Sequence, residues 1–192
     1  MSKSKDAALV RDARDLARRL LRRQQPERWL HSQGAANRAA ELANTVRKKD
    51  RPVLIAAAWV HDIGYSPDIQ QTGFHPLDAA LYLRDHGWDE RVTALVAHHS
   101  GARFVPARRG FGLLMAEFDL EDSDVADALT YADQTVGPTG KRVTIQDRIA
   151  EAMKRQPDSP NAKARIDREP SLLAAAARVE KRLAKQKKKH KS

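Results

Sequence analysis

The stretch from Val53 to Val60 restricts the fold of this chain more than any other part of the sequence. Its eight residues are all apolar, three of them are alanine, and none carries a charge. Such a run predicts a helix in the core, on which Leu54, Ala58 and His61 share one face. Asp62 follows directly, so two side chains able to bind a metal stand where the pattern predicts apolar contacts. A hydrogen-bonded His-Asp pair in the core would fit the same pattern, and the other helices have to decide.

Four further polar residues occupy inward positions on other predicted helices. His31 precedes Ala35 by one turn on the apolar stripe of its helix. His75, His99 and Asp133 fall in the same way among the apolar residues of their own helices. Because buried ionisable groups need partners, one shared cluster would satisfy all of them together with the first pair.

Helical periodicity continues along most of the chain, and no segment alternates as a half-buried strand would. We therefore predict an all-α fold, a helical bundle whose basic C-terminal tail is helical or disordered. Helices are expected over 6–24, 29–48, 123–136 and 144–155. Further helices are expected to begin at Pro52, His75, Asp89 and Ser171.

The length of 192 residues suits one domain with extensions. We expect an N-terminal helix in residues 1–26 that packs on the domain, and a metal-binding domain in 27–156. A C-terminal helix with a lysine-rich tail would occupy 157–192. Prolines between 157 and 170 indicate a linker before that last helix.

The chemistry of the expected cluster limits the metals that it would bind. Imidazole nitrogens and carboxylate oxygens, without sulfur, suit divalent iron, manganese, nickel or zinc. The chain has no cysteine, which excludes disulfides, thiolate ligands and cysteine nucleophiles. Six candidate ligands are too many for one open catalytic site, so we expect two metal ions bridged by one carboxylate.

The order of these residues resembles the HD-domain superfamily of metal-dependent phosphohydrolases. The resemblance spans roughly residues 29–136 and includes Gly64 after the His-Asp pair. It implies an HD-domain-like bundle with four ligands for the core metal: His31, His61, Asp62 and Asp133. It also implies that His75 and His99 are the additional pair of two-metal members, with Asp62 as the bridge. The spacing looks closest to small bacterial HD hydrolases, including those that split diadenosine tetraphosphate symmetrically.

His98 is a further candidate ligand, because it points to the flank of the stripe that His99 occupies. Some HD families, such as the HD-GYP cyclic-dinucleotide phosphodiesterases, use both histidines of such a pair. This chain lacks a Gly-Tyr-Pro segment after its His-His, which argues against that family. His99 is therefore the preferred ligand of the two.

The resemblance implies hydrolysis of a phosphoester or phosphoanhydride bond in a small, nucleotide-like substrate. Two metals would lower the pKa of a bridging water to near neutral and so supply the nucleophile. His61 and Asp62 are the expected catalytic residues. Three basic residues that follow ligand-bearing helices are expected to contact phosphate, with an ordinary solvated charge as the alternative for each: Arg103, Lys141 and Arg142.

Two other functions are compatible with the same residues. Some HD-fold proteins hold a mixed-valence di-iron centre and oxidise a small substrate with oxygen, through ligands in the same order. The chain would otherwise be a non-catalytic HD module that binds a nucleotide or nucleic acid. The presence of every expected ligand argues against this last alternative.

The net charge of +10 is concentrated at the C-terminus. Residues 181–192 hold seven lysines and arginines and no acid, which leaves only +3 for the other 180 residues. Such a tail either stays solvated or binds nucleic acid weakly and without sequence preference. No window approaches the roughly 18 apolar residues of a membrane span, and the N-terminal residues lack a signal peptide. A cytoplasmic protein is therefore expected.

Overall fold

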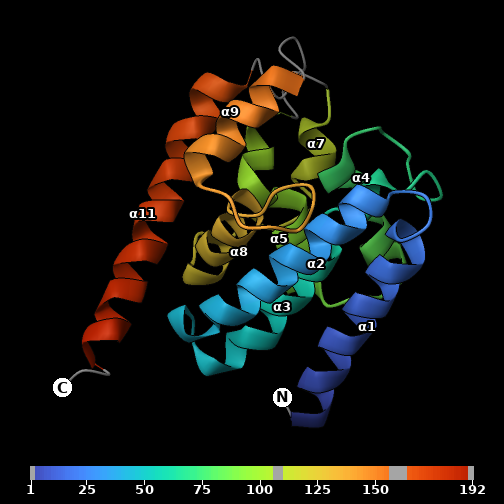
Figure 1. The fold of residues 1–192 in the computed structure, drawn as a ribbon. Coiled ribbons are helices and arrows are strands. Elements are labelled where there is room, and N and C mark those ends of the chain that lie inside the picture. Colours follow the sequence, from blue (N-terminus) through green and yellow to red (C-terminus); the bar gives the residue numbers. More distant parts are fainter. Residues whose placement is uncertain (1–2, 106–109, 156–163, 190–192) are drawn as a thin grey trace.

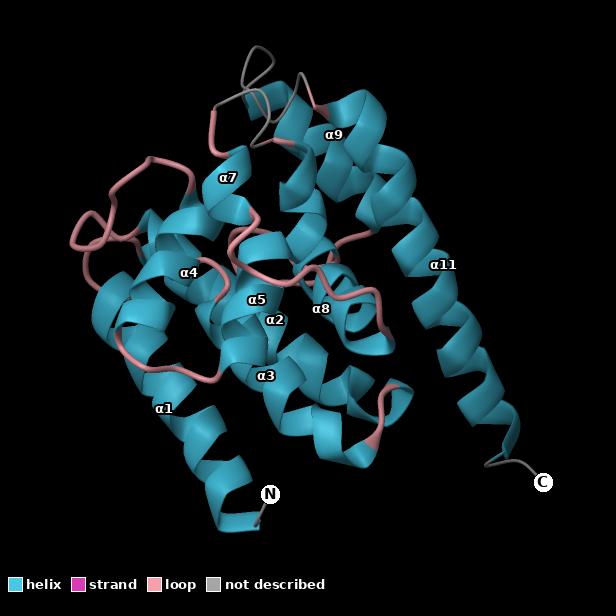
Figure 2. Ribbon diagram, turned by 180° about the vertical axis from the view of Figure 1, so that it is seen from behind, coloured by secondary structure: helices cyan, strands magenta, loops and turns pink. Residues whose placement is uncertain are grey.

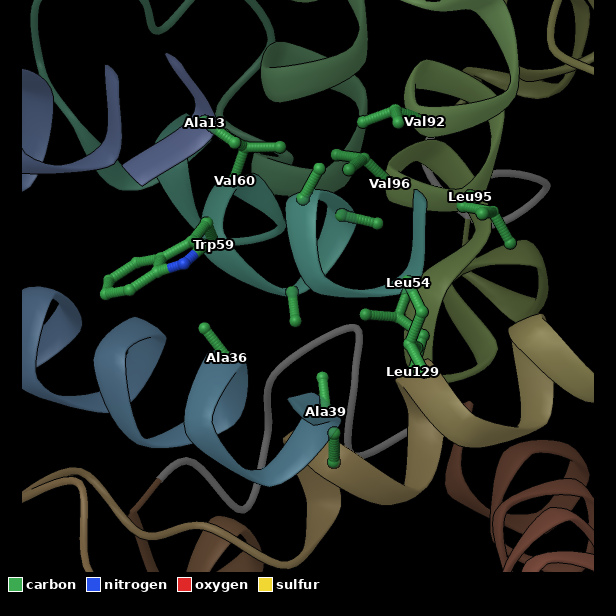
Figure 3. Close-up of a cluster of buried hydrophobic side chains, with 14 of the residues drawn as sticks. Ala13, Ala36, Ala39, Leu54, Trp59, Val60, Val92, Leu95, Val96 and Leu129 are labelled. Atoms are coloured by element: carbon green, nitrogen blue, oxygen red, sulfur yellow. The ribbon is translucent and has the colours of Figure 1, made fainter. Parts of the chain in front are cut away.

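Helix α3 (Arg51–Val60) runs through the middle of the fold, because almost all of its side chains are apolar and seven of its ten residues are buried. In this computed structural model, which describes residues 3–105, 110–155 and 164–189, four helices pack against it. These are α1 (Lys3–Leu21), α2 (Pro26–Glu41), α5 (Glu90–His98) and α8 (Asp124–Gln134). Figure 3 shows Leu54 of α3 against Leu129 of α8, and Trp59 above Ala36 of α2.

The other elements surround this centre (Figures 1 and 2). Helix α11 lies along α8 at the edge of the bundle far from α1. The longer helices are α4 (His75–Asp85), α9 (Ile145–Arg155) and α11 (Arg165–Lys189). The short elements are η1 (Leu42–Thr45), η2 (Lys48–Asp50), η3 (Ile63–Tyr65), η4 (His99–Phe104) and α7 (Gly112–Met115).

The predicted all-α class is confirmed. Within the described ranges no strand forms, and a single antiparallel bridge joins Val136 to Arg142. None of the helices in the described part of the chain is long and apolar enough to cross a bilayer. The predicted helices and the observed ones agree closely, apart from the two boundaries below.

The helix expected to reach residue 48 ends at Glu41, and a 3₁₀ turn follows. The Thr45 hydroxyl donates to the carbonyl oxygen of Leu42 at 2.7 Å, a local bond that competes with helix continuation. Helix α11 begins at Arg165 instead of Ser171 and contains Pro170. Proline that close to the helix start removes one backbone hydrogen bond without ending the helix. The remainder of the expected linker, 157–163, lies outside the described residues, as do the last residues of the tail.

Two apolar clusters hold the ends of α4 and α5 in place. Ala79 and Val96 belong to the main core around α3, whereas Leu77 and Ala97 belong to a smaller one that includes Phe74. Burial of each larger side chain in these clusters, such as Leu77, Val96 or Phe74, stabilises the fold by about 1.5–3 kcal/mol. Because α4 and α5 are anchored in both clusters, the residues at the start of α4 and after α5 have fixed positions.

Candidate metal centre

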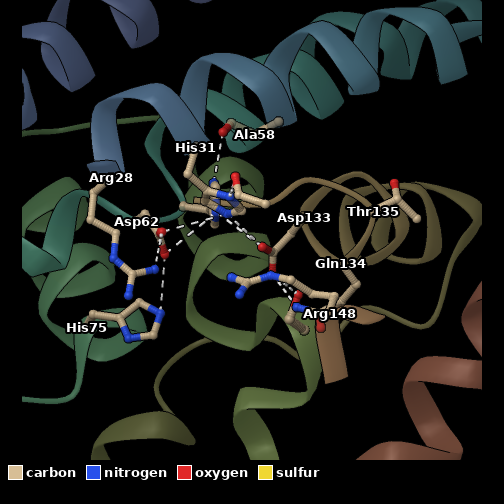
Figure 4. A network of polar contacts seen from close by, with 12 residues as sticks. Arg28, His31, Ala58, Asp62, His75, Asp133, Gln134, Thr135 and Arg148 are labelled. Atoms are coloured by element: carbon tan, nitrogen blue, oxygen red, sulfur yellow. Dashed lines mark hydrogen bonds and ion pairs between the residues drawn. The ribbon is translucent and has the colours of Figure 1, made fainter. Parts of the chain in front are cut away.

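The six residues that the sequence distributes over separate helices meet at the C-terminal end of α3. Figure 4 shows His31, Asp62, His75 and Asp133 of this group. Five of them are buried, and the sixth, His75, has a side chain that is 18% exposed. The elements that carry them are α2, the end of α3, the first turns of α4 and η4, and the last turn of α8. They are His31, His61, Asp62, His75, His99 and Asp133.

Three histidines of the cluster use the Nδ1 atom in the same way. In His61 and His99 it donates to the carbonyl group three residues earlier, at 2.8 and 2.6 Å. In His31 it donates to the carbonyl oxygen of Gly137 at 3.2 Å. A carbonyl oxygen can only accept, so Nδ1 carries a proton in all three rings and Nε2 is the atom of each ring that faces the cluster. This is the arrangement by which proteins orient metal-binding histidines.

The Nε2 atom of His61 is the polar atom at the centre of this arrangement. It is buried and has no hydrogen-bond partner among the described residues. It lies 3.6 Å from Oδ1 of Asp62 and 3.7 Å from Oδ1 of Asp133. Two ligands about 2.1 Å from one ion lie roughly 3.0–3.4 Å apart, which is close to these separations. The unpartnered nitrogen therefore fits a ligand position better than a satisfied core contact.

Asp133 is held so that one carboxylate oxygen faces the histidines. Its Oδ1 lies 2.8 Å from Nε2 of His31. Its Oδ2 accepts from the Ser100 hydroxyl and from Nε2 of Gln134, the latter at 2.8 Å. Ser100 adopts the left-handed conformation at φ 50° and ψ 39°, which is unfavourable for a residue with a Cβ. The strained residue Ser100 is thus the one whose hydroxyl holds Oδ2 of Asp133 in place.

Asp62 lies between the remaining members. Its Oδ1 is 3.4 Å from Nε2 of His75 and also faces His61, whereas its Oδ2 is 3.8 Å from Nε2 of His31. The Arg28 guanidinium donates to the same Oδ2 at 3.2 Å. Two oxygens that face histidines of different helices are what a bridging carboxylate needs. The atoms form two overlapping groups able to hold an ion: His31, His61 and Asp133, and His61, Asp62 and His99.

Burial and neighbouring charges shift the pKa values of the clustered residues in different directions. Burial opposes ionisation of both aspartates, but His61 and Arg28 outweigh it and hold the pKa of Asp62 below its usual range. Burial also lowers the pKa of His99, to about 4 with the help of the His61 charge, and it lowers the pKa of His75. For His61 the two carboxylates outweigh burial and raise the pKa to about 9. A metal cation would replace that proton.

The structure separates His98 from the cluster. Its Nε2 donates to the carbonyl oxygen of Phe118 at 2.8 Å, and among the described residues it takes part in none of the ion pairs or ring contacts that join the six. Helix α5 ends at His98, whose φ of −105° and ψ of 4° depart from regular helix, and successive side chains on a helix already point about 100° apart. The neighbouring histidines consequently face different surroundings.

The three basic residues expected at the substrate have other surroundings. Arg103 is exposed, stacks on Phe104 and donates to the Ser171 hydroxyl at 3.4 Å. Arg142 is exposed and pairs with Glu41, and Lys141 beside it is exposed too. None of the contacts found in the described ranges joins them to the metal cluster. A phosphate role for them remains a prediction.

Two arginines next to the cluster were missed by the sequence reasoning. Arg28 pairs with Asp62 and lies 3.8 Å over the Tyr65 ring, which itself stacks on His75. Its position three residues before His31, on the same helical face, is a signal that could have been used. Arg168 of α11 donates from Nε to the carbonyl oxygen of Ser100 at 2.7 Å. No pattern in the sequence indicates that contact.

An all-helical fold that gathers histidines and aspartates from separate helices defines a class of metal-binding domains. The sequence matches the HD domain family over residues 28–133, which is more than half of the chain. The chain belongs to the HD-domain family, whose members are generally metal-dependent phosphohydrolases. No curated protein and no solved structure matches the chain.

Proposed function

We propose that this protein is a metal-dependent phosphohydrolase that cleaves a phosphoester or phosphoanhydride bond in a nucleotide-like substrate. The observation that carries the proposal is the buried Nε2 of His61, which lies between two carboxylates and has no hydrogen-bond partner in the part of the chain that the structure describes. His31, His61, Asp62 and Asp133 would hold one divalent ion, and His75 and His99 would complete a second site bridged by Asp62. Divalent iron, manganese, nickel or zinc suits these donors.

Metal ions at these positions would supply Lewis acidity and a water of lowered pKa. The residues of the chain would do the rest. Backbone carbonyls fix the rings of His31, His61 and His99, so Nε2 of each ring already faces the cluster and the rings need not rotate. Arg28 neutralises part of the charge on Asp62 and keeps the carboxylate in place.

Tyr65 is the group best suited to donate a hydrogen bond from its hydroxyl to the substrate. Burial, followed by the Asp62 charge, raises its pKa to about 12, so the phenol stays neutral at physiological pH. Its ring is held between the Arg28 guanidinium and the His75 imidazole. A neutral hydroxyl in this position would donate to a phosphate or leaving-group oxygen without adding negative charge.

The first test is metal analysis of protein purified without chelators, followed by phosphate release from a panel of nucleotides with Mn²⁺ or Fe²⁺. We expect bound metal, with two ions per chain, and turnover that falls at least about 10³-fold in Asp62→Ala. Glu117→Ala, which alters an exposed carboxylate paired with Arg84, is the matched control. Equal phosphate release by wild type and Asp62→Ala across the panel would contradict the proposal.

The same preparation separates hydrolysis from the oxygenase alternative. Anaerobic purification and electron paramagnetic resonance report a mixed-valence di-iron centre directly. A mixed-valence signal coupled to oxygen consumption, without phosphate release, would contradict the hydrolase proposal and show that the protein is an oxygenase. For the hydrolase we expect phosphate release that is independent of oxygen.

A further inference from the structure

Arg168 brings a positive charge to the metal cluster, and no carboxylate of the described residues forms an ion pair with it. Its Nε donates to the Ser100 carbonyl oxygen, and within the described ranges it forms no ion pair. Burial lowers the pKa of Arg168, and the attraction of Asp133 and Tyr65 only partly compensates. Arg168 is half-buried, and a cation that is partly withdrawn from water without an ion-pair partner favours an anion that arrives from outside.

The chain builds a specific support for this side chain. Ser100 and Gly101 are both left-handed, at φ 50° and 70°, and turn the Ser100 carbonyl group toward α11. A Cβ on Gly101 would lie 2.8 Å from Cγ of Arg168, so the glycine leaves room for the arginine stem. The Ser100 hydroxyl at the same time holds Asp133. One strained residue therefore connects the guanidinium with a metal-site carboxylate.

The surroundings of Arg168 show where its charge acts. The pKa of the Tyr65 phenol is affected by burial, Asp62, Arg28 and also Arg168, so both guanidiniums act on that hydroxyl. Arg148 of α9, which Figure 4 shows beside Gln134, repels Arg168. Its side chain is 12% exposed and forms an ion pair with Glu151 at 3.5 Å. Positive charge thus gathers on the side of the cluster that faces α9 and α11.

Arg168 and Arg148 both lie outside the residues that match the HD-domain family. The C-terminal segment of this chain therefore adds cations to a metal site that the HD domain supplies. Arg28 is already engaged with Asp62, whereas Nη1 and Nη2 of Arg168 have no partner in the described part of the chain. Two parallel N–H donors match two oxygens of a phosphoryl group.

We propose that Arg168 binds a phosphoryl group adjacent to the one that is cleaved, so that the site selects phosphoanhydrides over phosphomonoesters. This inference rests on the proposed function for the identity of the reacting group. The binding of the anion itself does not depend on it, because Arg168 is positioned by Ser100 and Gly101 and by the packing of α11 against η4. Metals would hold the reacting phosphoryl group, and the guanidinium would hold its neighbour.

The direct test uses full-length protein stripped of metal and titrated calorimetrically with inorganic pyrophosphate at low salt. We expect wild type to bind it and Arg168→Gln to bind it about 10- to 100-fold more weakly, as for loss of charge-assisted hydrogen bonds. Arg168→Lys keeps the positive charge but lacks the two parallel N–H donors of the guanidinium. Its affinity for pyrophosphate should lie between those of Arg168→Gln and wild type. Arg11→Gln, which removes an exposed cation of α1, should bind as wild type does. Unchanged binding in Arg168→Gln would overturn the proposal.

Thermal unfolding distinguishes an anion receptor from a structural arginine. Because the charge lacks a counter-ion, Arg168→Gln should leave the unfolding midpoint of the metal-free protein unchanged or raise it. Pyrophosphate should raise the midpoint of wild type and of Arg11→Gln but not that of Arg168→Gln. A large fall of the midpoint in Arg168→Gln without anion would show that the residue supports the fold, and the proposal would fail.

A kinetic comparison tests the choice of substrate. For an active preparation, Arg168→Gln should raise KM about 10-fold or more for a nucleoside diphosphate and change KM little for the monophosphate. Equal effects on both substrates would contradict the assignment to an adjacent phosphoryl group. If wild type hydrolyses neither, the proposed function fails, and pyrophosphate binding still decides the role of Arg168.

Discussion

A Cβ on Gly64 would lie 2.0 Å from the carbonyl oxygen of His75 and 2.9 Å from the backbone nitrogen of Ala79. The glycine that follows the His-Asp pair therefore allows the first turn of α4 to contact the end of α3. This contact brings His75 to within 3.4 Å of Asp62. The close approach, and not an unusual backbone conformation, is what requires glycine here.

Gly64→Ala should consequently separate α4 from η3 and remove His75 from the cluster. We expect a loss of about 3 kcal/mol in the free energy of unfolding, the upper range for overpacking a core. The number of metal ions bound per chain should also fall, because one ligand is displaced. Gly112→Ala is the control, since a Cβ there meets nothing within 4 Å. Denaturant titration and metal analysis measure both effects, and equal behaviour of the two variants would contradict the prediction.

Metal binding should release a proton from His61. Its pKa of about 9 in the metal-free cluster means that the ring is charged at pH 7, whereas a metal ligand must be neutral. The apparent affinity should therefore rise with pH, about tenfold per unit between pH 6 and 8, and level off above 9. Calorimetry in buffers of different ionisation enthalpy measures the released proton. Affinity that is independent of pH over this range would refute the charged state of His61.

Ser100→Ala should weaken metal binding without unfolding the protein. The hydroxyl donates to Asp133, and loss of such an outer contact typically reduces metal affinity about 10- to 100-fold. Gln134 still donates to the same oxygen, so the carboxylate keeps one support. Ser171→Ala, which removes a hydroxyl bonded to exposed Arg103, should leave the affinity unchanged. Competition with a chromophoric chelator gives the two affinities.

The acid side of the stability profile should depend on Asp50. This buried carboxylate accepts from Arg91 at 2.6 Å and from Arg47 at 2.7 Å, and these contacts outweigh burial and lower its pKa from 3.8. Its folded pKa lies below its unfolded one, so the stabilisation is present above pH 3.8 and is lost as the pH falls through the lowered folded pKa.

Asp50→Asn should accordingly be less stable than wild type at pH 6, and the difference should shrink toward pH 2. Urea unfolding at a series of pH values measures it. Asp15→Asn, in an exposed pair with Arg14, should follow wild type throughout. A stability difference for Asp50→Asn that does not change with pH would show that the aspartate acts through packing alone.

The sequence was sufficient to predict the helices and the six clustered residues, because each polar side chain interrupts an apolar face that helical periodicity makes visible. It was not sufficient to choose between His98 and His99. Both lie near the same stripe, and only the contacts of the folded chain separate them: His98 donates to the carbonyl oxygen of Phe118, whereas His99 donates to that of Val96. The domain boundaries and the two-metal assignment remain predictions.

Arg168 shows the other limit of the sequence. Its position depends on a left-handed pair, Ser100 and Gly101, and on the docking of α11 against η4. A serine in that conformation contradicts local preference, and the proline at 170 suggested a linker instead of a helix. Contacts between residues 68 positions apart leave no periodic trace.

The Nδ1 protons of His31, His61 and His99 all go to main-chain oxygens, those of Gly137, Ala58 and Val96. Replacing a side chain cannot delete a peptide carbonyl, so the orientation of these rings is largely immune to point mutation at their partners. Only a change that moves the backbone can disturb it. Gly34 is one such place, because a Cβ there would lie 2.5 Å from the carbonyl oxygen of Gly140, in the turn that contains Gly137. Substitutions at glycines that are not metal ligands are therefore the ones expected to disturb the orientation of these histidine rings.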